Sequence, residues 1–125
     1  MAKRKPIQWL TKEKVRAAAG ESDEAALACS AKHWWQVSHA TADHLRRAFR
    51  RWDVDLGIEF CALCRRYPCE SCPVGRLYGG CKNKAFGYRD ARQARDEWLY
   101  GEGTFAAFQQ AALKVWRNLK SLGPD

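Results

Sequence analysis

The chain has 125 residues, 46% of them hydrophobic and 12% aromatic, which is enough apolar material for one domain with a core and excludes a disordered tail. Lysine and arginine number 22 against 14 acidic residues, and the resulting net charge of +8 favours a polyanionic partner, nucleic acid first, although a solvated basic surface has the same composition. No apolar run of about 18 residues occurs and the first 20 residues are too polar for a signal peptide, so we expect a cytoplasmic protein without membrane contact.

The first half of the chain predicts an arm followed by three helices. Residues 1–10 are expected to form a basic flexible arm, and residues 11–125 a single helical domain. Three residues that precede helical patterns are typical N-caps: Thr11, Ser22 and Thr41. The first helix is expected to end at Gly20, and the second at about Val37.

The helix after Thr41 has an apolar side and an arginine side. Its apolar positions follow the i, i+3, i+4, i+7 spacing of a buried face: Leu45, Ala48, Phe49 and Trp52. The remaining positions carry four arginines: Arg46, Arg47, Arg50 and Arg51.

Two more helices are predicted near the end of the chain. One spans about Arg89 to Tyr100, and Thr104 caps the other. The apolar positions of the last helix form a long stripe: Phe105, Phe108, Ala112, Val115, Leu119 and Leu122. The predicted fold class is therefore mainly α, a small helical domain with a cysteine-rich, zinc-knuckle-like insert at residues 61–88.

The insert contains five cysteines: Cys61, Cys64, Cys69, Cys72 and Cys81. The first four form two C-x₂-C pairs, a spacing that lets two thiolates point at one ion while backbone N–H groups approach the sulfurs. In a cytoplasmic protein such a cluster indicates a metal site rather than disulfides. A closed set of four thiolates around Zn²⁺ is structural, because it leaves no position for a reactive water. An iron–sulfur cluster is the alternative, since Cys72 is followed by proline as in ferredoxin-type sequences.

Five thiols compete for four positions, so two ligand sets remain open. One uses the two C-x₂-C pairs. The other replaces Cys69 by Cys81 and leaves Cys69 to pack or to form a hydrogen bond. Cys29, on the helix after Ser22, is far away in the sequence and is expected to be a buried apolar residue.

Basic and aromatic residues alternate around the insert. The basic candidates for nucleic-acid binding are Arg65, Arg66, Arg76, Lys82, Lys84 and Arg89, with Arg92 and Arg95 further on. Tyr78 and Phe86 are the candidates for stacking on bases, and the four arginines after Thr41 form a second strip. The pattern does not distinguish DNA from RNA. The alternative to nucleic-acid binding is that the basic residues form a solvated surface and the aromatic rings pack on the insert.

Catalytic signatures are missing from the sequence. It contains no HNH-type nuclease set, Ser/His/Asp set, P-loop, dinucleotide fingerprint or deaminase motif. We therefore expect a non-enzymatic protein without a small-molecule substrate.

The segment that ends in His33-Trp34 and the insert together resemble a group of small proteins encoded by bacteriophages and prophages. In that group a Ser-x-x-His-Trp segment precedes a C-x-L-C…C-x-x-C-P…C insert and a helical tail that contains aromatic residues. The gap between the two cysteine pairs is shorter here, and the segment around Phe86 departs from the group's pattern. The resemblance implies a phage origin, a metal-bearing fold and a location in the host cytoplasm, but no activity.

His33 occupies the histidine position of that segment and is a candidate metal-site neighbour. It either replaces one thiol as a ligand, bonds to a cysteine sulfur, or packs against the insert, and the packing interpretation is favoured. A second functional hypothesis is that the protein binds and redirects a host protein, such as a polymerase, a nuclease or a defence factor. It rests on four tryptophans beyond the needs of a small core: Trp9, Trp34, Trp35 and Trp116.

Overall fold

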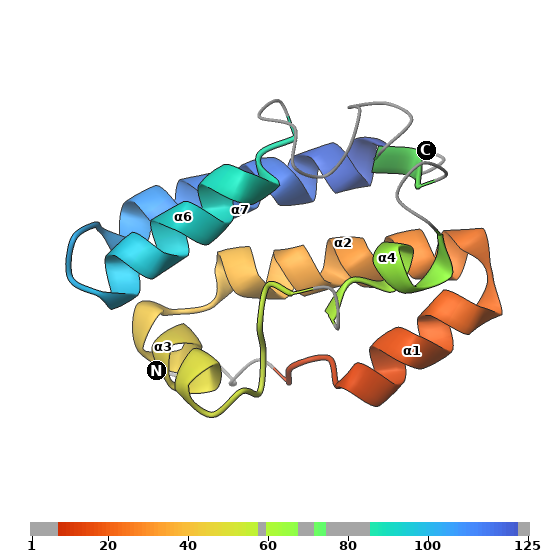
Figure 1. Ribbon diagram of the computed structural model, residues 1–125, viewed down its shortest axis with the longest axis horizontal. Helices are drawn as coiled ribbons and strands as arrows, with labels where there is room; N and C mark the ends of the chain where they lie inside the picture. Colours follow the sequence, from red (N-terminus) through yellow and green to blue (C-terminus); the bar gives the residue numbers. More distant parts are fainter. Residues whose placement is uncertain (1–7, 58–59, 68–71, 75–85, 123–125) are drawn as a thin grey trace, which may run out of the picture.

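The computed structural model describes residues 8–57, 60–67, 72–74 and 86–122 (Figure 1). Its helices are α1 (Lys12–Glu21), α2 (Asp23–His39), α3 (Ala42–Arg50), α4 (Ala62–Arg66), α6 (Tyr88–Leu99) and α7 (Phe105–Ser121). No strand occurs in these residues, which confirms the mainly α class. Within the same residues, no helix combines the length and the apolar composition that a bilayer crossing requires.

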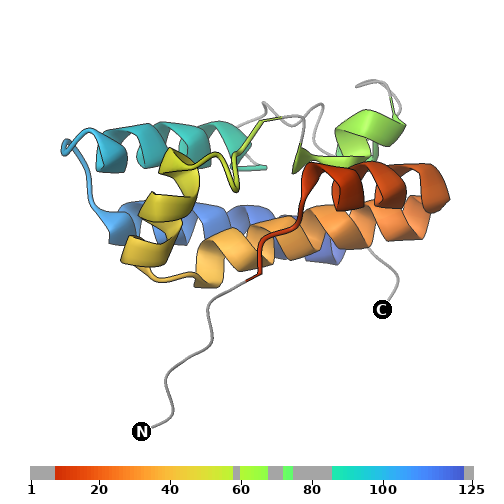
Figure 2. The ribbon, with the colours of Figure 1, turned by 90° about the horizontal axis from the view of Figure 1, so that it is seen from below.

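The central element is α2. It packs against α1, α4 and α7, and α7 also packs against α6. Helices α6 and α7 form a hairpin that lies along α2 (Figure 1). Helix α3 runs steeply across the end of the molecule where the α6–α7 turn lies (Figure 2). This arrangement leaves one side of α3 facing away from the core.

The four N-caps predicted from the sequence are confirmed. The side-chain oxygens of Thr11, Ser22, Thr41 and Thr104 accept the backbone N–H of the third residue after them at 3.2, 3.0, 3.3 and 3.1 Å. Each cap satisfies an N–H group that has no partner within the first turn of a helix. The helix boundaries differ from the predicted ones by no more than a residue or two.

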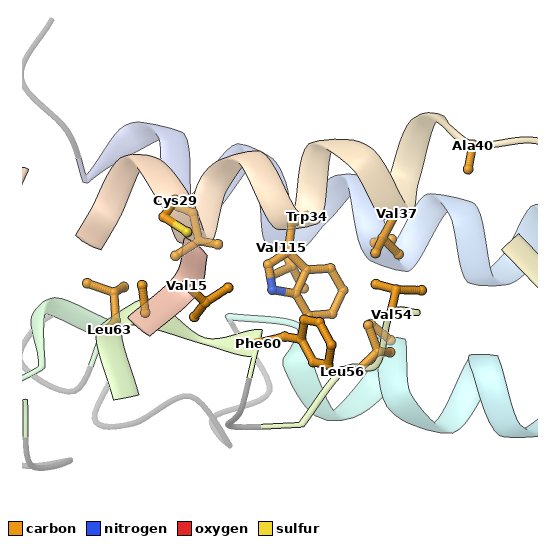
Figure 3. Packing of buried hydrophobic residues seen from close by; sticks show 14 of the residues in the cluster. Val15, Cys29, Trp34, Val37, Ala40, Val54, Leu56, Phe60, Leu63 and Val115 are labelled. Carbon is orange, nitrogen blue, oxygen red and sulfur yellow. The ribbon is translucent and has the colours of Figure 1, made fainter. Parts of the chain in front are cut away.

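The core lies between α2 and the segments that cover it. Figure 3 shows Val54, Leu56 and Phe60 gathered beside Trp34 and Val37 of α2. The predicted stripe of α7 is confirmed, since its four central positions are buried: Phe108, Ala112, Val115 and Leu119. Phe108 meets the rings of Phe49 from α3 and Trp98 from α6, with centroids 6.3 and 5.8 Å away, and so joins three helices.

Trp52 corrects the prediction of a buried face on α3. Leu45, Ala48 and Phe49 are buried as expected, but Trp52 is 73% exposed. The helix ends at Arg50 and Trp52 has a left-handed backbone with φ of 61°, so the helical spacing no longer sets its direction.

The predicted flexible arm is fixed at its inner end. The Gln36 side chain of α2 donates from Nε2 to the carbonyl of Gln8 at 2.7 Å and accepts the N–H of Leu10 on Oε1 at 3.2 Å. Residues 8–10 are therefore attached to α2, and residues 1–7 lie outside the described residues.

Candidate functional site

The first cysteine pair lies at the start of α4, against α2. Cys61 directly precedes α4, and its Sγ accepts the backbone N–H of Cys64 at 3.4 Å. The Leu63 N–H donates to Ser30 Oγ of α2 at 3.3 Å and anchors the same turn. A hydrogen bond from the Cys64 side chain is the main reason why the pKa of Cys61 falls to about 7, while burial opposes the shift. This N–H···S geometry is typical of the knuckle that a C-x₂-C pair forms around a metal ion.

The other cysteines do not complete a metal site within the described residues. Cys72 is buried, and no three His, Cys, Asp or Glu side chains of the described segments converge on one point. Cys69 and Cys81 lie outside the described residues. The metal and its full ligand set therefore stay predictions.

Cys29 is buried, as predicted from its place on a helix outside the insert. Its neighbour in space is more informative. Burial raises the pKa of the Cys29 thiol, and the charge of Cys61 raises it further. The Cys29 thiol therefore lies near Cys61. The sequence alone did not indicate this, because the two cysteines are far apart along the chain.

His33 is a packed histidine of the core. Its ring is 3% exposed and stacks on Phe60 at 5.8 Å with an interplanar angle of 20°. Nδ1 is buried and has no hydrogen-bond partner in the described part of the chain. Burial lowers the pKa of His33 to about 4, so the ring is neutral at physiological pH. The packing interpretation is supported, and a direct bond to a metal stays a prediction.

Helix α3 and its C-cap residue present three arginines to solvent. Arg47, Arg50 and Arg51 are exposed, and none of them forms an ion pair or a ring contact with the described residues. We call these three residues the α3 arginine face. Arg46 does not belong to it, because its guanidinium lies 5.2 Å from the centre of the Trp98 ring and 3.9 Å from Asp43.

Two arginines near the insert are bound within the protein, which corrects the idea that the whole basic cluster is free to bind phosphates. Arg66 lies 2.5 Å from Asp23 and donates to the carbonyl of Ala19 at 2.8 Å. Arg95 lies 2.7 Å from Asp55. Both guanidinium groups thus already have acidic partners within the protein, while Arg65 is exposed on α4.

Arg89 lines an open cavity of about 760 Å³ along α6. The described lining residues are Tyr88, Arg89, Arg92, Gln93, Asp96, Glu97, Tyr100 and Glu102. Charges of both signs meet there, and these lining residues include no serine, cysteine or histidine nucleophile. The cavity is thus a mixed-charge surface rather than a basic strip.

The prediction that Phe86 stacks on nucleic-acid bases is wrong. Its ring is 3% exposed, and its carbonyl accepts a hydrogen bond from Asn118 Nδ2 at 2.9 Å, because the segment packs on α7. The other candidates of this part of the insert lie outside the described residues: Arg76, Tyr78, Lys82 and Lys84.

The tryptophans divide between core and surface. Trp34 and Trp98 are buried, whereas Trp35 is 41% exposed. Trp35 stacks on His39 at 4.7 Å, and His39 meets the Trp116 ring edge-on at 5.2 Å. Sequence reasoning missed Trp52 as a surface residue, although the residues after it, Asp53, Asp55 and Gly57, are typical of a chain that has left its helix.

Comparisons with known proteins do not assign the chain to a family. No protein-family model matches it, and searches of curated proteins and of solved structures give no match.

Proposed function

We propose that this protein is a non-enzymatic nucleic-acid-binding module whose contact surface is the α3 arginine face. The observation that carries the proposal is the state of these three guanidinium groups. They are exposed, unpaired within the described residues and within five residues of one another at the C-terminal end of α3. The opposite side of that helix is held in the core by Leu45, Ala48 and Phe49.

Arginine suits this role because its planar guanidinium binds phosphate oxygens in pairs and keeps its charge at any physiological pH. The local alternative is that the arginines only complement the negative C-terminal end of α3. That effect stabilises a helix by about 0.3–1 kcal/mol per charge. It explains why the positions tolerate arginine, but it requires neither three of them nor a chain with a net charge of +8.

The cysteine insert has a structural part in this proposal. We assign Cys61 and Cys64 as two ligands of a zinc ion, which fits their shared turn and the N–H···S contact of 3.4 Å. The sequence offers Cys69, Cys72 and Cys81 for the remaining positions. The ion would fix α4 and the chain that follows it against α2, and it would take no direct part in the contacts of the α3 arginine face.

The proposal is tested by the salt dependence of binding. Each neutralised phosphate contributes about 0.7 to the slope of log K against log salt on single strands and about 0.9 on duplex DNA. The double variant Arg47→Ala with Arg50→Ala should therefore lower the slope by about 1.4 or about 1.8 units. The measurement is fluorescence anisotropy of a labelled oligonucleotide at several salt concentrations.

Lys14→Ala with Arg16→Ala provides the matched control, since it removes two exposed charges from α1. This variant should change the slope by much less. If the control lowers the slope as much as the α3 variant does, the decrease reflects net charge alone and not contacts made by the α3 arginine face. A wild-type protein without affinity for any oligonucleotide at about 50 mM salt, where phosphate contacts are strong, would make the proposal wrong.

A second candidate function is the binding of a host protein by a phage-encoded accessory protein. The surface cluster of Trp35, His39 and Trp116 favours it, because exposed tryptophans anchor protein interfaces. Capture from lysate with and without nuclease treatment separates the two functions. Partners that persist after nuclease treatment and are lost in Trp35→Ala would support this candidate.

A further inference from the structure

Trp52 stands at a position of the α3 terminus that glycine normally occupies. Its N–H donates to the carbonyl of Phe49 at 3.3 Å, and the N–H of Asp53 donates to the carbonyl of Ala48 at 3.0 Å. This pair of bonds is a Schellman motif, in which the residue after the C-cap takes a left-handed conformation. Trp52 is that residue, with φ of 61°, and no other non-glycine residue in the described part of the chain has a positive φ.

Nothing within the described structure compensates for the tryptophan at this position. A side chain with a Cβ is strained in the left-handed region, and glycine would satisfy the same two hydrogen bonds without that strain. The indole is 73% exposed, so burial does not repay the strain either. It has no ring or cation–π contact with the described residues. Backbone strain that local packing does not explain is characteristic of functional positions.

The neighbours of Trp52 indicate its ligand. The ring directly follows Arg51, and the α3 arginine face lies within the five residues before it. An exposed aromatic ring beside unpaired guanidinium groups combines the two interactions that single-stranded nucleic acids require, phosphate neutralisation and base stacking. A duplex supplies the phosphates, but its base faces are covered by the neighbouring bases.

We propose that Trp52 is a base-stacking residue and that the ligand of the α3 surface is a single strand of DNA or RNA. This inference rests on the proposed function, to which it adds the class of nucleic acid and the residue that selects it. The arginines bind phosphates of either form, and Trp52 distinguishes unpaired bases from paired ones.

The test uses Trp52→Gly in the full-length chain, with labelled oligothymidylate and oligouridylate of about 16 nucleotides and a duplex of equal length as probes. Glycine relieves the left-handed strain, so the thermal midpoint of the variant should rise. Affinity for the single strands should fall about 5- to 150-fold, the range that loss of one stacked base produces. Affinity for the duplex and the salt slope on either probe should stay the same.

Two variants serve as controls. Trp52→Phe retains an aromatic face and should keep most of the single-strand affinity. Tyr100→Ala removes another exposed ring, 83% exposed, which lies beside the acidic residues Asp96, Glu97 and Glu102 of the α6 cavity. It should leave affinity unchanged, because the mixed-charge surface around Tyr100 lies outside the α3 arginine face.

The outcomes separate this inference from the function on which it rests. If the arginine variants weaken binding but Trp52→Gly does not, nucleic-acid binding stands and the stacking role is wrong. An equal loss on duplex and single strand also overturns it, since the ring would then not read unpaired bases. If the wild-type protein binds no probe, the proposed function and this inference fail together.

Discussion

His33 shows how a single buried group links the core to pH. The ring is stacked on Phe60 and shielded from solvent, so a proton there would be a buried charge. Burial lowers the pKa of His33 to about 4, and the negative charge of Asp55 opposes the shift without cancelling it. An unfolded histidine titrates near 6.5. Between these two values the unfolded chain binds more protons than the folded one.

The sign of the pH dependence follows from that difference. The stability that neutral His33 contributes should be complete above about pH 6.5 and should decrease as the pH falls toward 4. The free energy of unfolding should drop by up to about 1.4 kcal/mol per pH unit in this range. Urea denaturation at a series of pH values measures it.

His33→Gln is the control for this prediction, because glutamine does not titrate. Acid would also protonate the thiolates and release the proposed zinc ion, but that loss would be common to both proteins. The difference between the two pH profiles therefore reports His33 alone. Identical profiles would show that His33 is not held neutral in the folded state.

At the scale of elements, α4 is a short helix that depends on tertiary contacts. A helix of five residues is too short to be stable by itself. Arg66 connects it to the rest of the fold, with Asp23 at the start of α2 on one side and the Ala19 carbonyl near the end of α1 on the other. The contact between Ser30 and Leu63 adds a second attachment.

Arg66→Ala should therefore lower the thermal midpoint while leaving the salt slope of nucleic-acid binding unchanged. The reason is that its guanidinium already contacts the Asp23 carboxylate and the Ala19 carbonyl, so a phosphate would have to displace these partners. Arg66→Lys keeps the charge but loses the two-sided geometry, and it should restore only part of the midpoint. A decrease in salt slope as large as that of an α3 arginine variant would contradict this account and return Arg66 to the binding surface.

At the scale of the whole molecule, the metal prediction concerns how the insert is held. Protein purified without oxygen should contain about one equivalent of zinc and no visible absorption, because one closed thiolate site binds one ion. Strong chelation should lower the thermal midpoint, since structural zinc affinity is part of the folding free energy. Cys61→Ser and Cys64→Ser should have the same effect.

Cys29→Ser provides the matched control for the metal. Cys29 is a buried thiol close to Cys61 but outside the knuckle. This variant should retain its zinc, and a loss of zinc would make Cys29 a ligand. A brown colour with broad visible absorption would instead indicate that the site holds an iron–sulfur cluster rather than zinc.

The surface was the least predictable part of the molecule. Arg47 and Arg66 have the same side chain, and both were predicted from the sequence to bind phosphates. One is exposed on α3, and the other is bound to Asp23, which lies far from it along the chain. The predictions for Phe86 and Trp52 are both reversed: Phe86, predicted to stack on bases, is buried, and Trp52, predicted to lie in the core, is exposed. Such outcomes depend on which distant residues come together.

The sequence by itself determined the helices. An N-cap oxygen and the N–H it accepts are three residues apart, and an apolar stripe repeats within one or two turns, so Thr11, Ser22, Thr41 and Thr104 needed no knowledge of the fold. The same holds for the turn that joins Cys61 to Cys64. Only the tertiary structure decided which of the charged and aromatic side chains remain available. That availability depends on partners many residues away, such as Asp55 for Arg95 and Trp98 for Arg46. Such partners cannot be predicted from a local sequence pattern.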